Sequence, residues 1–89
     1  MSATVAAIEA RLTEALAPVS LHIDDESALH AGHAGARDGG GHYRVDIVSA
    51  AFAGKNTVAR HRLIYAALGD LMPRAIHALA IRASAPDEL

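Results

Sequence analysis

The sequence lacks cysteine and tryptophan, and its 89 residues include only one phenylalanine and two tyrosines. Without cysteine the chain can form no disulfide, no thiolate nucleophile and no cluster site made of cysteines alone. Hydrophobic residues make up 52% of the chain, but many of them are alanine, so we expect a thin aliphatic core. Such a core is too small to enclose a large cofactor. The length predicts one small domain, residues 1–89, that buries roughly 60–65% of its extended surface on folding.

Also absent are a long apolar run and a strong excess of charge of one sign. No stretch approaches the roughly 18 unbroken apolar residues of a membrane span. The first part of the chain shows no basic region followed by an apolar segment, as a secretory signal would. We therefore expect a cytoplasmic protein without membrane contact. The formal net charge is -2, which gives no general attraction to nucleic acid.

The first half of the chain predicts a helix followed by two strands. Apolar residues recur at spacings of three and four over residues 4–16, which is typical of one face of a helix. Residues 19–24 and 42–49 alternate apolar and polar side chains, the pattern of half-buried strands. Residues 25–41, between these strands, show no sustained periodicity. Loops of this length are uncommon in compact domains and tend to be functional or disordered.

The next segment predicts a turn and a second helix. Gly54 can take the positive φ that a turn needs. Asn56 is a good N-cap for a helix over residues 57–72, and Pro73 then ends this helix. Spacings of three and four predict a buried stripe along the helix, which Ile64 and Leu71 reinforce. The stripe comprises Val58, His61, Tyr65, Leu68 and Met72.

The last segment predicts a third strand over residues 76–83, with His77, Leu79 and Ile81 on one face. The tail from Ser84 is expected to be a short frayed end. A strand–helix–strand connection almost always crosses over right-handed, which makes its two strands parallel. The second and third strands then run parallel, and the first pairs antiparallel with the second. The fold class is α/β (α+β), a three-stranded mixed sheet covered by helices.

This topology gathers histidines at one end of the sheet. The long loop enters the second strand at the edge where the third strand begins, and the residues that converge there are His30, His33, His42 and His77. Imidazole suits zinc, copper and iron, and it replaces thiolate on one iron of Rieske-type 2Fe-2S clusters. The alternative is that His77 bonds a backbone carbonyl at the start of its strand and that the loop histidines are solvated.

A hydrolytic zinc held by these histidines is a further alternative. The nearby carboxylates, at residues 24–26, have no definite placement as a general base. The small domain also lacks the bulk to build a substrate pocket. We therefore expect that the protein is not an enzyme.

Six short motifs occur in order along the chain: DDES, HAGHAG, HYRVDIVS, F-x-G-K, RHR-x-x-Y and IHALAI. Together they resemble the BolA family, over nearly the whole chain from about residue 16 to residue 88. The resemblance implies an αββαβ fold similar to class II KH domains.

The resemblance also implies a partner and a cofactor. BolA-like proteins partner monothiol glutaredoxins and share with them a glutathione-ligated 2Fe-2S cluster. They act in iron–sulfur and iron homeostasis or in cluster trafficking. We expect no bound cluster in the isolated chain. By this similarity His77 is the invariant cluster ligand, and a cysteine or histidine of the long loop is the second. This chain has no cysteine and therefore resembles the His-loop subtype, with His30 in that role and His33 as the alternate.

A second function that the resemblance implies is transcription regulation, as in stress responses, through DNA binding by the second helix and the turn before it. The residues that would contact phosphate are Lys55, Arg60, Arg62 and Arg74. The net negative charge and the absence of a GxxG loop argue against this function. Alternatively, these cations form a solvated face or meet the glutaredoxin. Alone, the chain is expected to be a monomer or a weak homodimer.

Overall fold

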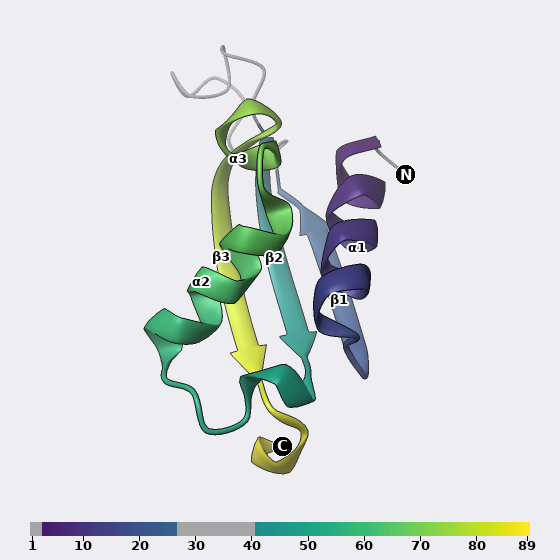
Figure 1. Ribbon diagram of the computed structural model, residues 1–89. Helices are drawn as coiled ribbons and strands as arrows, with labels where there is room; N and C mark the ends of the chain where they lie inside the picture. The colour runs from purple at the N-terminus through teal and green to yellow at the C-terminus, as the bar shows by residue number, and fades with distance from the viewer. Residues whose placement is uncertain (1–2, 27–40) are drawn as a thin grey trace.

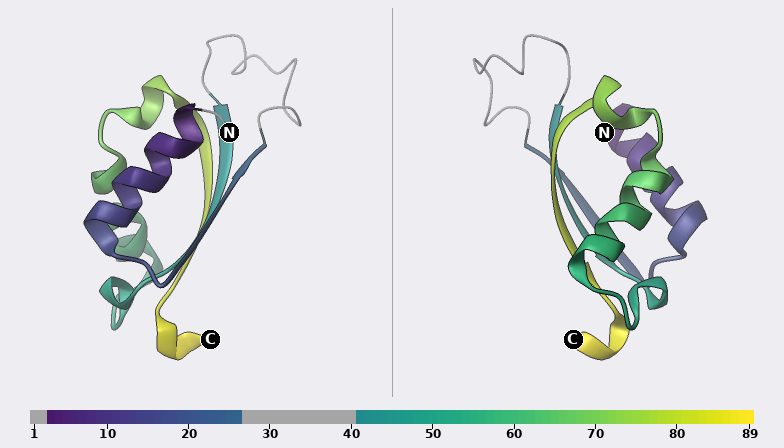
Figure 2. Two further views of the ribbon diagram at one scale, coloured as in Figure 1. Left: turned by 90° about the vertical axis from the view of Figure 1, so that its right-hand side faces the viewer. Right: turned by 60° about the vertical axis from the view of Figure 1, so that its left-hand side comes forward.

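Three strands form one sheet in the computed structural model, which describes residues 3–26 and 41–89. Helices α1 (Ala3–Leu16) and α2 (Thr57–Leu68) cover one face of the sheet and leave the other face open (Figure 1 and Figure 2). Within these described ranges no helix is both long and apolar enough to cross a membrane. The strands are β1 (Ser20–Asp25), β2 (Gly41–Val48) and β3 (Ile76–Ser84), and the short turns are η3 (Ala50–Phe52), α3 (Leu71–Arg74) and η4 (Pro86–Glu88).

The strand order confirms the predicted topology. β1 pairs antiparallel with β2, with Leu21 opposite Ile47. β2 pairs parallel with β3, with Val45 opposite Ile81. β2 is therefore the central strand. β2 and β3 begin at the same end of the sheet, beside α3, and the C-terminus lies at the opposite end (Figure 1).

The core lies between the sheet and the two helices. Tyr43, Val45 and Ile47 of β2 are buried, as the alternation of this strand predicts. The turn η3 contributes Phe52, which is fully buried and anchors the connection from β2 to α2. The helices contribute Ile8, Leu12, Leu16, Ile64 and Leu68.

Helix α2 begins where the sequence predicts and ends earlier. The side-chain oxygen of Asn56 accepts a hydrogen bond from the N–H of Ala59 at 2.9 Å, which confirms the N-cap. The helix stops at Leu68 because Gly69 takes a φ of 54°, which costs glycine little since it has no Cβ. The prediction that the helix runs to residue 72 and is ended by Pro73 is therefore wrong, and α3 is a separate turn.

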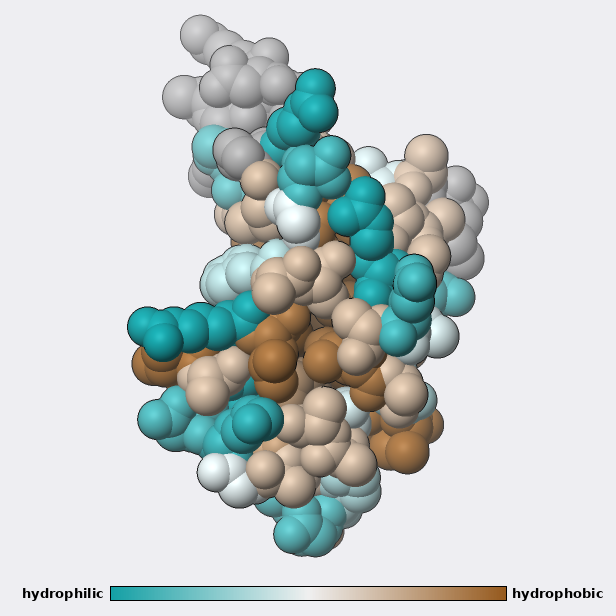
Figure 3. Space-filling model, viewed as in Figure 1, coloured by the Kyte–Doolittle hydropathy of each residue, from teal (hydrophilic) through white to brown (hydrophobic). Residues whose placement is uncertain are grey.

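The predicted buried stripe of α2 is only partly right. Val58 is 58% exposed and Tyr65 is 42% exposed, whereas Ile64 and Leu68 face the core. Apolar residues are spread almost all around this helix, so their spacing alone does not select one face. Hydrophobic side chains consequently reach the surface on the helix side of the molecule (brown in Figure 3).

The C-terminal tail is docked, so the prediction of a frayed end is wrong. Ala85 is fully buried directly after β3, and the turn η4 follows it. The N–H of Ser49 donates a hydrogen bond to the carbonyl of Ser84 at 3.0 Å, which continues the pairing of β2 and β3 to this end of the sheet. The tail is part of the packed structure.

Candidate functional site

A bulge at the start of β3 places the predicted ligand His77. Gly41 is paired with Ile76, and the next residue, His42, is paired with Ala78. His77 is therefore an additional residue between two regular pairs. A bulge of this kind breaks the alternation of a strand and re-aims the side chain beside it.

The bulge reverses the expected face of His77. Ile76 is fully buried, and Leu79 and Ile81 pack against the core, whereas His77 is exposed. The prediction that His77 shares one face with Leu79 and Ile81 is wrong, because strict alternation does not survive an inserted residue. The imidazole of His77 is consequently accessible from solvent.

The rings of His42 and His77 lie against each other. Their centroids are 5.3 Å apart and their planes are inclined by 50°, within the range at which aromatic rings pack. The two rings differ in exposure, since His77 is exposed and the Nε2 atom of His42 is buried from solvent. The fold thus brings together one exposed histidine and one half-buried histidine from two different strands.

Gly41 allows the close approach on which this arrangement depends. A Cβ at this position would lie 2.5 Å from ring atoms of Tyr43, so any other residue would displace that buried ring. The N–H of Gly41 donates to the carbonyl of Ala75 at 3.0 Å, and the N–H of Glu26 donates to the carbonyl of His42 at 2.7 Å. The start of β2 is thereby held on both sides.

A shallow hollow of about 320 Å³ adjoins His42. It is lined by residues of β2 and β3 and by Glu26, which follows β1. Nε of Arg44 lies 3.6 Å from Oε2 of Glu26. The residues that line the hollow are Glu26, His42, Tyr43, Ala78, Leu79 and Ala80.

The sequence of the chain matches the family model described as BolA-like protein over residues 12–88. The chain belongs to the BolA-like family. The BolA domain of SufE1 from Arabidopsis thaliana has a similar structure, with a TM-score of 0.88 and 41% sequence identity, covering 100% of this chain and 99% of that one. The fold is therefore the α+β fold of BolA domains, as predicted.

Two relatives of similar sequence carry different names. SufE-like protein 1, chloroplastic/mitochondrial, of Arabidopsis thaliana is 46% identical over 87 residues, which are 92% of this chain and 24% of the relative. The DNA-binding transcriptional regulator BolA of Escherichia coli (strain K12) is 39% identical over 74 residues, which are 83% of this chain and 68% of the relative. The chain thus spans about a quarter of the first relative and about two thirds of the second.

Of the four histidines that the sequence predicts to converge, His42 and His77 lie in contact. His30 and His33 lie outside the described residues, and residues 3–26 and 41–89 contain no group of three His, Cys, Asp or Glu that could hold a metal ion. His22 is exposed on β1, and its Nε2 lies 3.0 Å from Asp24. The alternative of a hydrolytic zinc therefore gains no support from this part of the chain.

The four predicted phosphate-contacting cations divide into two groups. Lys55, Arg62 and Arg74 are exposed, and Arg74 lies 3.9 Å from Asp70. The side chain of Arg60 is only 12% exposed. Arg60 therefore has a different environment from the other three.

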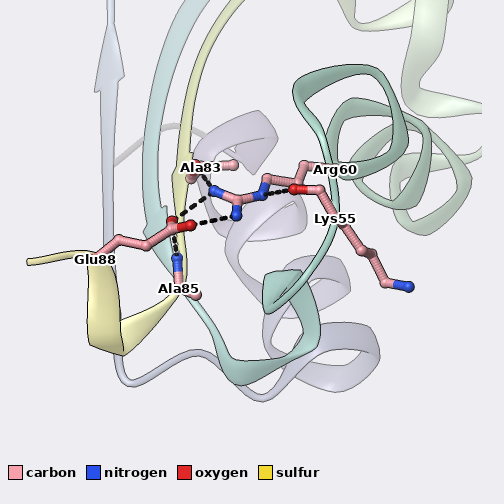
Figure 4. A network of polar contacts seen from close by, with 5 residues as sticks. All are labelled: Lys55, Arg60, Ala83, Ala85 and Glu88. Atoms are coloured by element: carbon pink, nitrogen blue, oxygen red, sulfur yellow. Dashed lines mark hydrogen bonds and ion pairs between the residues drawn. The ribbon is translucent and has the colours of Figure 1, made fainter.

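Arg60 holds the C-terminal tail against α2 (Figure 4). Its Nε donates to the carbonyl of Lys55 at 2.8 Å, and its Nη1 donates to the carbonyl of Ala83 at 3.0 Å. Both terminal nitrogens donate to the carboxylate of Glu88, at 2.7 and 2.6 Å. This bidentate pair, which we call the Arg60–Glu88 clamp, is the geometry in which arginine binds carboxylate most strongly.

The clamp changes the acidity of both groups. Hydrogen bonds from Arg60 and from the N–H of Ala85 lower the pKa of Glu88 from its ordinary value of 4.5 to about 2. The hydrogen bond to Glu88 raises the pKa of Arg60 above its ordinary value. The sequence interpretation missed Glu88. A signal was present, because Pro86 followed two residues later by a glutamate is typical of the start of a helical turn.

Proposed function

We propose that this chain partners monothiol glutaredoxins and co-ligates a glutathione-bound 2Fe-2S cluster, in iron–sulfur or iron homeostasis or in cluster trafficking. The observation that carries the proposal is the exposed imidazole of His77, which the bulge of β3 presents at the end of the sheet. Membership of the BolA-like family supports it, because the family resemblance implies this partner and this ligand.

The donor set of the chain fits one half of such a cluster. Among the described residues the ring of His77 makes no hydrogen bond, and it is exposed, so its imidazole is available as a donor. Imidazole replaces thiolate on one of the two irons in Rieske-type clusters. His30 is the expected second donor and His33 the alternate. When bound, the cluster would supply one-electron redox chemistry or a transferable iron–sulfur unit.

The need for a partner follows from the composition. A 2Fe-2S cluster takes four ligands, which are thiolates on at least one iron. This chain has no cysteine and cannot supply any thiolate. The remaining ligands must come from another molecule, and the thiolates of a monothiol glutaredoxin and of glutathione are the proposed ones. This chain's own contribution is to present and orient imidazole.

Anaerobic co-expression with a monothiol glutaredoxin tests the proposal. We expect the purified complex to show a visible absorption and circular dichroism spectrum that differs from that of the glutaredoxin with its own cluster. His77→Ala should abolish this spectrum, while association of the two apoproteins persists. An unchanged spectrum with His77→Ala would contradict the assignment of this ligand.

The loop ligands are tested in the same complex. We expect that His30→Ala makes the cluster labile, and that His30→Ala combined with His33→Ala resembles His77→Ala. The matched control is His22→Ala, because His22 is also an exposed histidine of the sheet but lies on β1. Loss of the cluster in the His22 variant would indicate a general effect of removing surface imidazole.

DNA binding is the second candidate function that we propose. It is favoured by the exposure of Lys55, Arg62 and Arg74 and by the printed name of the Escherichia coli relative. The clamp withdraws Arg60, so the proposed phosphate-contacting face narrows to three cations. Removing Lys55 and Arg62 together should weaken binding about equally for unrelated sequences and lower the salt slope by about two. Absence of any mobility shift by the unmodified chain at low salt would contradict direct DNA binding.

The cytoplasm remains the proposed compartment, and a monomer or weak homodimer the proposed state of the isolated chain. Light scattering after size-exclusion chromatography at two protein concentrations checks the oligomeric state. A dimer that persists at the lower concentration would contradict it. Fractionation of cells that express the chain checks the compartment.

A further inference from the structure

His77 lies on the part of β3 that regular strand pairing does not hold. It is the inserted residue of the bulge, between Ile76, paired with Gly41, and Ala78, paired with His42. A histidine that binds a metal is usually oriented by a hydrogen bond from its second ring nitrogen to a carboxylate or carbonyl. In the described part of the chain the His77 ring has no such bond. The interaction that the described residues offer to orient this ring is its packing against His42.

His42 is the ring that packs against it, with centroids 5.3 Å apart. His42 is half-buried, and its Nε2 atom is covered. Its carbonyl accepts a hydrogen bond from the N–H of Glu26, the residue after β1, and the N–H of the preceding residue, Gly41, donates to the carbonyl of Ala75. His42 is thus the fixed member of the pair, and His77 is the exposed member.

We infer that His42 is a positioning residue: its ring limits the orientations of the His77 imidazole and holds it ready for a group that a partner brings. This inference rests on the proposed ligand role of His77. Because Nε2 of His42 is withdrawn from solvent, His42 acts through the His77 ring and is not itself assigned as a ligand. A flexible side chain loses rotamer freedom when it is fixed by a ligand, so a ring that is already restricted binds with less entropy loss.

The chemistry of the role predicts which substitutions preserve it. His42→Phe keeps a planar ring beside His77 and removes both nitrogens. His42→Ala removes the ring as well. If packing positions His77, the Phe variant retains the function and the Ala variant loses it. If His42 binds the group through a nitrogen, both variants lose it.

The first measurement uses the apoprotein and needs no cluster. Nuclear Overhauser contacts between the ring protons of His42 and His77, with the χ1 couplings of His77, report the orientation of its side chain. We expect one dominant χ1 rotamer in the unmodified chain and in His42→Phe, and averaging over rotamers in His42→Ala. Averaged χ1 couplings for His77 in the unmodified chain would overturn the inference, whatever the fate of the proposed function.

The second measurement uses the complex with a monothiol glutaredoxin. The rate at which the visible spectrum is lost to a chelator should rise about tenfold for His42→Ala, the scale expected when the support of a metal ligand is removed. It should stay within about twofold for His42→Phe and for the control His22→Ala. Equal acceleration by the Ala and Phe variants would overturn the positioning role in favour of direct ligation.

The two proposals fail in different ways. If the unmodified chain forms no cluster with any monothiol glutaredoxin, the proposed function fails, and the ring contacts in the apoprotein still decide whether His42 orients His77. If the cluster forms and His42→Ala leaves both the χ1 rotamer and the rate of loss unchanged, the positioning role fails and the proposed function stands.

Discussion

The two ends of β3 differ in how their polar side chains are satisfied. At the C-terminal end the guanidinium of Arg60 donates from Nε, Nη1 and Nη2, and the carboxylate of Glu88 receives two of these bonds and that of a backbone N–H. At the N-terminal end His77 is exposed, and within the described residues its ring makes no hydrogen bond and packs against the ring of His42. We call the C-terminal end of β3, with Arg60 and Glu88, the closed end, because hydrogen bonds satisfy its polar side chains. We call the N-terminal end, with His77, the open end, because its imidazole is accessible.

The difference separates stability from binding. A mostly covered guanidinium needs partners, because a buried charge that is left unpaired is costly. An exposed imidazole has no such requirement, so we expect its removal to cost little folding stability. We therefore expect changes at the closed end to act on folding and changes at the open end to act on ligand binding.

Phe52→Ala should have the largest effect on stability, because it removes the core side chain that anchors the connection beside the closed end. Phe52 is fully buried, and truncating such a residue typically costs about 3–5 kcal/mol. Urea unfolding followed by circular dichroism measures the loss. Val19→Ala is the control, since Val19 is 70% exposed. A loss of less than about 1 kcal/mol for Phe52→Ala, typical of surface changes, would contradict the described core.

Arg60→Ala should lower the melting temperature by less than Phe52→Ala and by more than His77→Ala. It removes the donor to the carbonyls of Lys55 and Ala83, and it leaves the carboxylate of Glu88 with only the backbone N–H of Ala85. Arg60→Lys should restore only part of the loss, because one ammonium cannot reproduce the planar fork of a guanidinium. Arg62→Ala, an exposed neighbour on α2, is the matched control. If Arg60→Lys restored the full melting temperature, positive charge alone would account for the stabilisation, and the bidentate geometry would not be needed.

Glu88→Gln should give a smaller loss that depends on pH. The pKa of Glu88 is lowered from 4.5 to about 2 in the folded chain, so as the pH falls the unfolded chain takes up this proton first. The stabilisation from ionised Glu88 is complete above about pH 4.5 and is lost progressively toward pH 2. The difference in melting temperature between the unmodified chain and Glu88→Gln should therefore be constant near neutral pH and shrink below pH 4.5.

The pH series has its control on α1. Glu14→Gln removes an exposed carboxylate of helix α1. We expect the melting temperature of this variant to follow that of the unmodified chain at every pH. If the difference in melting temperature between the unmodified chain and Glu88→Gln grows toward low pH, ionised Glu88 does not stabilise the fold as we describe.

His77→Ala should have the smallest effect on stability. Substitutions of exposed residues away from caps and networks usually change the free energy of unfolding by no more than about 0.5 kcal/mol. Urea unfolding of the apoprotein checks this value. A loss above about 1 kcal/mol would mean that the bulge depends on the imidazole, and the contrast between the two ends would then be weaker than we describe.

Much of the open end could be predicted from the sequence. The strand directions follow from the crossover rule, so the convergence of His42 and His77 at one end of the sheet can be predicted from the sequence. The bulge cannot be predicted in this way, because the pattern of β3 reads as an uninterrupted alternation. Only the pairing with β2 shows that Ile76 takes the buried position and that His77 is the inserted residue.

The closed end was harder to predict for a different reason. Arg60 and Glu88 are 28 positions apart, and the local sequence around each does not predict that they pair. The sequence indicated a basic helix and a frayed tail, whereas the fold brings the two together and neutralises both charges. The end of helix α2 was also mispredicted. Gly69 ends the helix by taking a positive φ, which the spacing of apolar residues does not predict.

The most direct test compares His77→Ala with Arg60→Ala in two assays on each variant, the melting temperature of the apoprotein and the visible spectrum of the complex with a monothiol glutaredoxin. The account predicts opposite outcomes. His77→Ala should keep the melting temperature and lose the spectrum, and Arg60→Ala should lower the melting temperature and keep the spectrum at temperatures where it is folded. Retention of the spectrum by His77→Ala, or its loss in folded Arg60→Ala, would contradict the division of roles between the two ends of β3.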